Sequence, residues 1–176
     1  MNPLSWIFFG TGALAESVLM SLVRAGYIPK YVVTKPDRPS GRHLAMTKPY
    51  IKTWCEMKGI PVLQPENLKT LEETSPLYAG EYDVFIVASY GKIIPEKILE
   101  TPRMGVLNVH PSLLPKYRGP SPLESVLLDG EMTTGVSIMK LDKEMDHGPI
   151  LVQNMFTINP LATTGTLEVS DRKSVV

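Results

Sequence analysis

The chain has 176 residues, which suits one domain. Its 18 Lys and Arg balance its 18 Asp and Glu, so the formal net charge is zero and excludes binding to nucleic acid or membranes through global charge. The single cysteine, Cys55, excludes an intrachain disulfide and fits a reducing compartment. Residues 4–9 lack the basic start of a signal peptide and no segment has the roughly 18 consecutive apolar residues of a membrane span, so we expect a cytoplasmic protein with no membrane partner.

Short apolar segments alternate with amphipathic segments along most of the chain. Residues 4–9 are apolar and precede a glycine, which is typical of a buried strand, and residues 13–25 have the apolar spacing of a helix that Gly26 ends. Residues 36–46, rich in polar residues and Pro, are expected to form a long loop. The same reasoning predicts strands at residues 30–34, 60–63, 82–88, 105–109, 136–140 and 150–156, and helices at residues 48–58, 66–73, 93–100 and 122–128.

This order of elements predicts an α/β fold. Alternating strands and helices indicate a mostly parallel sheet with helices on both faces and right-handed crossovers. The last two strands, residues 136–140 and 150–156, are close in sequence, so we expect an antiparallel pair at the edge. Residues 163–168 resemble the entry to a further helix, with one of the threonines of this segment as its cap. Residues 170–176 lack helical patterning, and we expect a non-native tail that interrupts the natural reading frame near Val169.

A glycine motif follows the first strand and opens the first helix. Residues 10–15 read Gly-Thr-Gly-Ala-Leu-Ala, the G-x-G-x-x-A form of the dinucleotide fingerprint. A dinucleotide site also needs an acidic residue after the second strand, and Thr34 and Lys35 stand there instead. A tight strand-to-helix turn is therefore favoured over a dinucleotide site.

Asn108, His110 and Asp146 form the sharpest set of catalytic candidates. If residues 105–109 are a strand, Asn108 and His110 lie on one side of it at the carboxyl edge of the sheet, where ligands bind. An amide N–H can stabilise the oxyanion that forms when an amine attacks an acyl carbon, and an imidazole can donate to that oxyanion or move the proton of the amine. Asp146 could orient His110 or relay the proton. Taken separately, Asn108 could cap a loop, His110 could be a half-buried histidine with satisfied hydrogen bonds, and Asp146 could begin a turn. Their combination favours acyl transfer to an amine.

Other catalytic chemistries fit the sequence less well. Ser112 lacks the G-x-S-x-G elbow and is too close to His110 for the usual serine triad. The histidines form no ligand pattern with nearby carboxylates, so we expect no metal. Cys55 lies in a predicted helix beside Trp54, which favours packing over nucleophilic attack.

The segment from Lys35 to Lys52 is locally basic. It carries Lys35, Arg38, Arg42, Lys48 and Lys52 against Asp37. Such a patch suits a phosphate backbone, and composition supports a solvated loop equally well, so both interpretations stay open.

Five segments carry a resemblance to a known family. They are TKPDRPSGR (34–42), GIPV (59–62), SYGKIIP (89–95), NVHPSLLPKYRG (108–119) and DHGPI (146–150). Together they resemble the amino-terminal catalytic domain of the methionyl-tRNA formyltransferase family, over most of residues 4–168. The segments at 108–119 and 146–150 resemble all formyl-tetrahydrofolate-dependent transferases, whereas the segment at 34–42 points more narrowly to the tRNA enzyme.

The resemblance implies a Rossmann-like formyltransferase domain over residues 1–169. The activity it implies is formyl transfer from 10-formyltetrahydrofolate to the amino group of initiator methionyl-tRNA, without a metal, for translation initiation. It assigns catalysis to Asn108, His110 and Asp146. It further assigns the folate pocket to Phe85, Ser89, Tyr90, Gly91, Ser112, Leu113, Leu114 and Pro115, and tRNA contact to Arg38, Arg42 and Lys48.

Two departures from the family bear on tRNA binding. After Arg42 the family often continues with Gly and Lys, whereas residues 43–46 read His-Leu-Ala-Met, which should weaken phosphate contact. We also expect the carboxy-terminal barrel domain and the last catalytic-domain helix of the family to be absent, and the chain to be a monomer of low activity. Rival functions are those of another 10-formyltetrahydrofolate-dependent transferase or hydrolase and of a non-catalytic Rossmann binding module. Substitution of Asn108 and His110 by Ala would separate an enzyme from a binding module.

Overall fold

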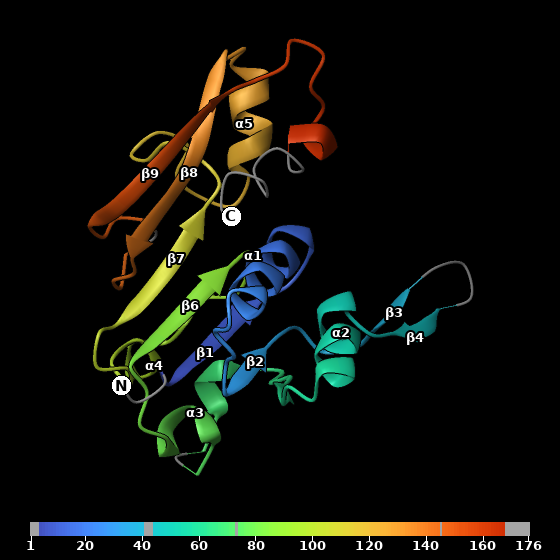
Figure 1. Cartoon of the computed structure of the whole chain (residues 1–176), viewed down its shortest axis with the longest axis vertical. Helices are drawn as coiled ribbons and strands as arrows, with labels where there is room; N and C mark the ends of the chain where they lie inside the picture. The colour runs from blue at the N-terminus through green and yellow to red at the C-terminus, as the bar shows by residue number, and fades with distance from the viewer. Residues whose placement is uncertain (1–3, 41–43, 73, 145, 168–176) are drawn as a thin grey trace.

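The computed structural model describes residues 4–40, 44–72, 74–144 and 146–167. Within these ranges a seven-stranded sheet has the strand order β5-β2-β1-β6-β7-β8-β9 (Figure 1). The parallel strands are β5 (Val62–Leu63), β2 (Tyr31–Val33), β1 (Trp6–Gly10), β6 (Val84–Ala88) and β7 (Val106–His110), and β8 (Thr133–Lys140) and β9 (Ile150–Thr157) follow antiparallel. The helices are α1 (Ala13–Arg24), α2 (Tyr50–Lys58), α3 (Pro76–Ala79), α4 (Glu96–Leu99) and α5 (Pro122–Leu128), with a short 3-10 helix η1 (Leu68–Thr70). The predicted α/β fold and its antiparallel closing pair are confirmed.

Both faces of β1 and β6 are largely buried, which explains their continuous apolar sequences. Along β1, Trp6 and Phe8 pack into a cluster with α1 and α2 on one face, and Ile7 and Phe9 pack into a second cluster on the other. Leu77 of α3 and Ile98 of α4 belong to the second cluster. The alternation of side chains along each strand therefore divides the core between two helical layers.

The chain reverses its direction across the sheet at β1. The connection through α1 leads to β2 on one side of β1, whereas β6 pairs with the other side. The loops after β1 and β6 consequently diverge at the carboxyl edge of the sheet. Open α/β sheets bind ligands in the crevice that forms at such a reversal.

The predicted loop at residues 36–46 is wrong in part, because the described residues on either side of 41–43 form a β-hairpin. Strands β3 (Arg38–Ser40) and β4 (Ala45–Thr47) pair antiparallel and project from the body of the molecule (Figure 1). All three residues of β4 are exposed. The hairpin is held by backbone pairing without a core beneath it, so it leaves no pattern of apolar residues in the sequence.

Helix predictions between β5 and β7 are the least accurate. The predicted helix at 66–73 is reduced to η1, because the Asn67 side chain accepts a hydrogen bond from Lys69 N at 2.9 Å and Leu71 is already extended. The predicted helix at 93–100 begins only after Pro95 and is α4. Helix α3, which Ser75 caps, was not predicted.

The last described residues pack on α5. Leu123 and Val126 of α5 form a third apolar cluster with Ile158 and Leu167. The Thr163 hydroxyl accepts a hydrogen bond from Thr166 N at 3.4 Å at the start of a helical turn, so Thr163 is the threonine of this segment that caps it. The expected tail at 170–176 lies outside the described residues.

Candidate active site

Strand β7 presents an amide and an imidazole at the carboxyl edge of the sheet. Val106 belongs to the second apolar cluster and Val109 to the first, so Asn108 and His110 share the face of Val106. This placement on one side of the strand agrees with the prediction. His110 is 5% exposed, and Asn108 is half-buried.

Asp146 reaches the same place from the loop between β8 and β9. Its Oδ1 accepts a hydrogen bond from Asn108 Nδ2 at 3.4 Å, and its Oδ2 lies 3.7 Å from His110 Nδ1. The Gly119 backbone N–H donates to Oδ2 at 2.9 Å. Asp146 has φ +47°, in the left-handed region that is costly for a residue other than glycine. Tertiary contacts thus hold this carboxylate between the two β7 side chains.

The tautomer of His110 follows from its second contact. Nε2 lies 2.9 Å from the backbone oxygen of Tyr117, and a carbonyl oxygen can only accept, so Nε2–H is the donor. In the neutral ring Nδ1 is then unprotonated, and it is the atom that faces Asp146. His110 can therefore take up a proton at Nδ1, where the Asp146 carboxylate stabilises the resulting charge.

Hydrogen bonds from β8 and β9 fix the loop that follows β7. Ser137 Oγ donates to Ser112 O at 2.6 Å and accepts from Leu114 N at 3.1 Å. Gln153 Nε2 donates to Leu114 O at 2.9 Å, and Ser112 Oγ donates to Lys116 O at 2.8 Å. Ser137 and Gln153 were missed from the sequence, where nothing local distinguishes them from other strand residues. They set the path of the chain towards Gly119, which holds Asp146.

The three candidate residues open onto a cleft of about 600 Å³. One wall comes from the segment after β6 and another from the loop after β8. Its size lies in the range of small-molecule sites, and it combines apolar side chains with a few polar groups, as such sites do. Apolar lining residues absent from the predicted site include Val87, Ile93, Ile94, Leu99 and Leu141.

The cleft includes only part of the predicted folate pocket. Ser89, Tyr90 and Gly91 line it. Phe85 is fully buried and packs against the rings of Phe9 and Tyr82, so it lies in the core instead. The segment after His110 contributes Pro111, Gly119, Pro120 and Pro122 to the cleft lining. Ser112, Leu113, Leu114 and Pro115 do not line it.

Three other sequence interpretations can be compared with the structure. The Ser112 hydroxyl is fully buried and donates to a backbone oxygen, an arrangement unlike a free nucleophile. A Cβ added to Gly10 would lie 2.6 Å from Ala15 Cβ and 2.8 Å from Ala88 O, so close packing alone explains that glycine. Cys55 is buried in the core, where burial raises the pKa of its thiol to about 12.

Two features are absent from the part of the chain that the structure describes. No group of three or more His, Cys, Asp or Glu side chains is arranged there to hold a metal ion. No helix there is long and apolar enough to cross a membrane.

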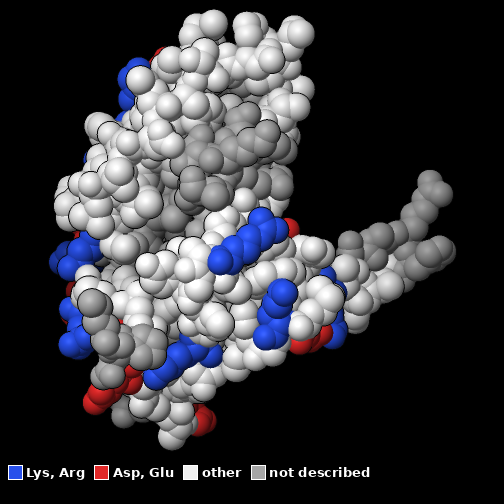
Figure 2. Space-filling model, viewed as in Figure 1, with Lys and Arg blue, Asp and Glu red and all other residues white. Residues whose placement is uncertain are grey.

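The basic segment at 35–52 acquires acidic partners from elsewhere in the chain. Arg38 pairs with Glu66 at 3.1 Å, and Lys48 pairs with Glu56 at 2.9 Å. Both cations stay accessible, with side chains 66% and 50% exposed. On the face shown in Figure 2, Lys and Arg form separate groups rather than one continuous patch. Arg42, the third predicted tRNA contact, lies outside the described residues.

A hydrogen-bonded pair, His147 and Asp142, links two positions of the loop that carries Asp146. His147 Nδ1–H donates to Asp142 Oδ2 at 3.0 Å, and this hydrogen bond raises the pKa of His147 and lowers that of Asp142. Asp142 lines the cleft. The pair therefore joins the two ends of the cleft wall that includes Asp146.

Comparison with known proteins identifies the family. Residues 5–174 match the sequence profile of the formyl transferase family. The chain belongs to this family. Two similar curated formyl transferases are the methionyl-tRNA formyltransferases of Chloroflexus aggregans, 50% identical over 161 residues, and of Thermotoga maritima, 44% identical over 162 residues. Each match covers 92% of the chain and 52% of the relative, so the chain spans about half the length of these relatives.

Solved formyl transferase structures share the fold. Glycinamide ribonucleotide transformylase 1 of Symbiobacterium toebii superposes with a TM-score of 0.77 at 18% identity, over 99% of the chain and 84% of that protein. Phosphoribosylglycinamide formyltransferase of Bacillus halodurans gives 0.77 at 22% identity, over 97% and 88%. A sugar 3N-formyl transferase, solved in the presence of dTDP and 5-N-formyl-THF, gives 0.71 at 19% identity, over 98% and 59%.

Proposed function

We propose that this formyl transferase chain moves a formyl group from 10-formyltetrahydrofolate to the amino group of initiator methionyl-tRNA. The observation that carries the proposal is the meeting of Asn108, His110 and Asp146 at the edge of one cleft. The choice of acceptor is supported by two methionyl-tRNA formyltransferases that are 50% and 44% identical to the chain over the 161 and 162 residues that align. The purine and sugar enzymes share only the fold at 18% to 22% identity, so they favour no other acceptor.

Each of the three side chains has a distinct task in this reaction. When an amine attacks a formyl carbon, the carbonyl oxygen becomes an oxyanion, and the Asn108 N–H donor is placed to stabilise it. The present hydrogen bond from Asn108 to Asp146 is long at 3.4 Å, so an oxyanion can replace the carboxylate as its acceptor. His110 accepts at Nδ1 the proton that the attacking amine loses, because its Nε2–H is already bonded to Tyr117 O. When the tetrahedral intermediate collapses, the bond between the formyl carbon and folate N10 breaks, N10 takes up that proton, and tetrahydrofolate leaves. Asp146 then stabilises the charged imidazole.

The donor substrate would occupy the cleft. Folate carries an aromatic ring system with polar edges, and the cleft offers both apolar side chains and backbone groups of the segment at 89–91. Its volume of about 600 Å³ suits a ligand of this size. The presence of 5-N-formyl-THF with the sugar 3N-formyl transferase supports a donor of the same chemical type. We assign Ser89, Tyr90 and Gly91 to donor binding, and we assign the predicted pocket residues Phe85 and 112–115 to the support of the cleft.

The acceptor tRNA would approach from the side of the β3–β4 hairpin. Arg38 and Lys48 are accessible there, and Arg42 falls between the two hairpin strands in sequence. A phosphate must compete with Glu66 and Glu56 for the first two cations, so we expect each to contribute modestly.

Two measurements test the proposal. The first is calorimetric titration of the chain with 5-formyltetrahydrofolate, with circular dichroism on the same sample, in which saturable binding by folded protein is expected. The second is formyl transfer to methionyl-tRNA, in which the wild-type chain should turn over and Asn108→Ala and His110→Ala should lose most turnover while keeping donor affinity. Folded protein that binds the donor without any turnover would favour a binding module, and folded protein that fails to bind it would rule out the assigned cleft.

A further inference from the structure

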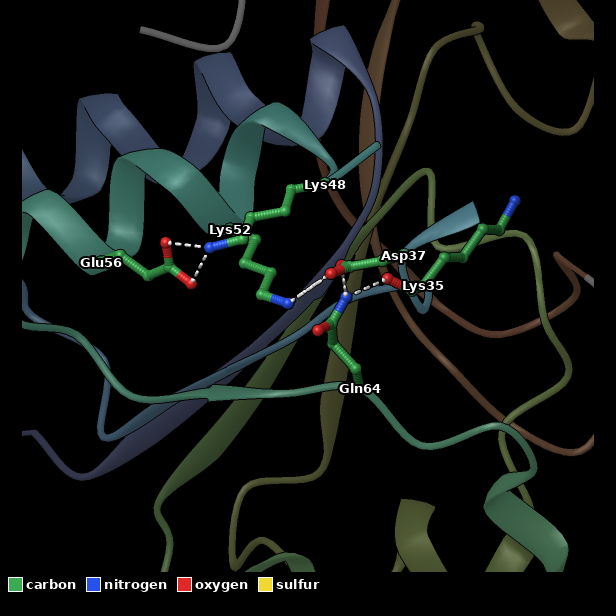
Figure 3. Close-up of polar contacts among 6 residues, drawn as sticks. All are labelled: Lys35, Asp37, Lys48, Lys52, Glu56 and Gln64. Atoms are coloured by element: carbon green, nitrogen blue, oxygen red, sulfur yellow. Dashed lines mark hydrogen bonds and ion pairs between the residues drawn. The ribbon is translucent and has the colours of Figure 1, made fainter. Parts of the chain in front are cut away.

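Among the described residues, one cation of the basic segment has no acidic partner. Lys52 Nζ donates a hydrogen bond to Asp37 at 2.8 Å, and Gln64 Nε2 donates to the same carboxylate (Figure 3). Lys48 and Arg38 are paired with glutamates as described above. The Lys35 side chain points away from this cluster, and its ammonium has no carboxylate of the described residues within 4.0 Å. Of the Lys and Arg residues that the structure describes in this segment, Lys35 is therefore the one that forms no ion pair with a described residue.

The backbone of Lys35 is nevertheless firmly held. Its N–H donates to Thr11 Oγ1 at 3.2 Å, and its carbonyl accepts from Gln64 Nε2 at 2.8 Å. Thr11 Oγ1 also lies 3.0 Å from the Thr34 hydroxyl. The turn after β1 and the segment after β5 thus fix the point from which the Lys35 side chain starts.

The Lys35 ammonium lies against Gly91. A Cβ added to Gly91 would be 2.9 Å from Nζ, and Gly91 has φ +68°, so a glycine both permits the turn and leaves room for the ammonium. Lys35 follows β2 and Gly91 follows β6, and β1 lies between these strands in the sheet (Figure 1). The side chain consequently spans the carboxyl end of β1, at the place where the chain reverses its direction across the sheet.

This position places at the entrance to the site a positive charge that no described carboxylate pairs. Gly91 lines the cleft that contains Asn108. The β3–β4 hairpin begins three residues after Lys35, on the β2 side of the sheet, whereas Asn108 lies on β7 on the other side of β1 and β6. A chain of phosphates that extends from the hairpin to Asn108 must pass over the ends of β1 and β6, where Lys35 stands.

We propose that Lys35 binds a phosphodiester group of the amine-bearing substrate, next to its reacting end. The proposal rests on the proposed function and adds a specific contact to it. Because no carboxylate of the described residues pairs with the Lys35 ammonium, it breaks no ion pair with them when it binds phosphate, unlike Arg38 and Lys48. Lys35 is thus the residue that aligns the acceptor end with the cleft, while the hairpin holds a more distant part.

Steady-state formyl transfer with Lys35→Gln, Lys35→Arg and Lys58→Gln in the full chain tests this contact. Loss of one charged hydrogen bond should raise the KM for methionyl-tRNA about tenfold in Lys35→Gln and leave the KM for 10-formyltetrahydrofolate unchanged. The slope of log KM for tRNA against log salt concentration should fall by about 0.7, the value for one single-strand phosphate contact. Lys35→Arg should preserve the slope. Lys58→Gln removes the same charge from an exposed lysine at the end of α2, which runs back to the opposite edge of the sheet, and should change neither quantity.

The outcomes separate this contact from the function on which it rests. An unchanged tRNA KM and salt slope in Lys35→Gln, with an active wild type, would overturn the contact and leave the function intact. A raised KM for the folate donor alone would assign Lys35 to a carboxylate of the donor and would also overturn the proposal. If the wild type had no activity, the proposed function would fail, and the contact would then be decided by binding of the trinucleotide CCA, for which Lys35→Gln must lower both the affinity and the salt slope.

Discussion

The Asn108 side chain donates a hydrogen bond to the Asp146 carboxylate at 3.4 Å, although 38 residues separate the two in sequence. Asn108 is fixed by strand β7, whereas Asp146 lies in a loop and is held by the Gly119 backbone N–H at 2.9 Å. The carboxylate thus keeps a short bond to the backbone when the longer bond to the amide is broken. Asn108 can therefore change its acceptor during a reaction while the site keeps its shape.

Asn108→Ala is expected to lower kcat for formyl transfer by about 10²-fold to 10³-fold, the usual effect of removing one oxyanion donor. The fold should be unaffected, because Gly119 still holds Asp146. Steady-state kinetics and a thermal melt on the same sample measure both effects. Asn159→Ala, which removes an exposed amide outside the cleft, serves as the control and should keep full kcat. A kcat for Asn108→Ala within a factor of three of wild type would contradict the catalytic role.

Gly10→Ala should destabilise the fold by about 1–3 kcal/mol, because the new Cβ would overlap Ala15 and the Ala88 carbonyl where β1, α1 and β6 meet. Gly165→Ala is the matched control. Its Cβ would meet no atom within 4 Å, so its free energy of unfolding should stay equal or rise by up to about 1 kcal/mol. Urea unfolding measures both changes. Equal stabilities of the two variants would show that close packing does not explain the glycine motif.

His147 should titrate above its ordinary pKa of 6.5, because its ring donates a hydrogen bond to Asp142. A raised folded-state pKa means that the stability from this pair is fully present below the unfolded pKa of about 6.5 and is lost as pH rises through the folded pKa. At the acid end the pair fails as pH falls through the lowered pKa of Asp142. Proton NMR titration of the imidazole gives the midpoint, and Asp142→Asn should return it towards 6.5. An unchanged midpoint in Asp142→Asn would exclude this pair as the cause.

Cys55 should resist thiol reagents in the folded protein. It is fully buried and its pKa is raised to about 12 by burial, so at pH 8 almost no accessible thiolate exists. Ellman's reagent should therefore react with one thiol per chain only after denaturant is added. Rapid reaction of the native protein would show that the core around α2 opens locally, and Cys55→Ala provides the blank.

Patterns confined to one element predicted the fold well. The apolar runs that became β1 and β6, and the spacing of apolar residues that became α1, report burial directly because each side chain faces a helical layer or water. The hairpin β3–β4 and the short helix α3 escaped prediction because few of their residues enter the core. Because apolar residues recur only weakly in such elements, their structure depends on local hydrogen bonds and on the connections to neighbouring elements.

The sequence by itself determined the α/β class, the shared side of Asn108 and His110, and the membership of residues 108–119 in a recognisable motif, because these follow from the period of a strand and from residue types. Only the tertiary structure decided which atoms meet. In the structure Phe85 lies in the core, and Arg38 and Lys48 form ion pairs with glutamates. The Lys35 side chain contacts Gly91 across the end of β1. Contacts between residues far apart in sequence depend on the order of strands in the sheet, and no local pattern contains that order.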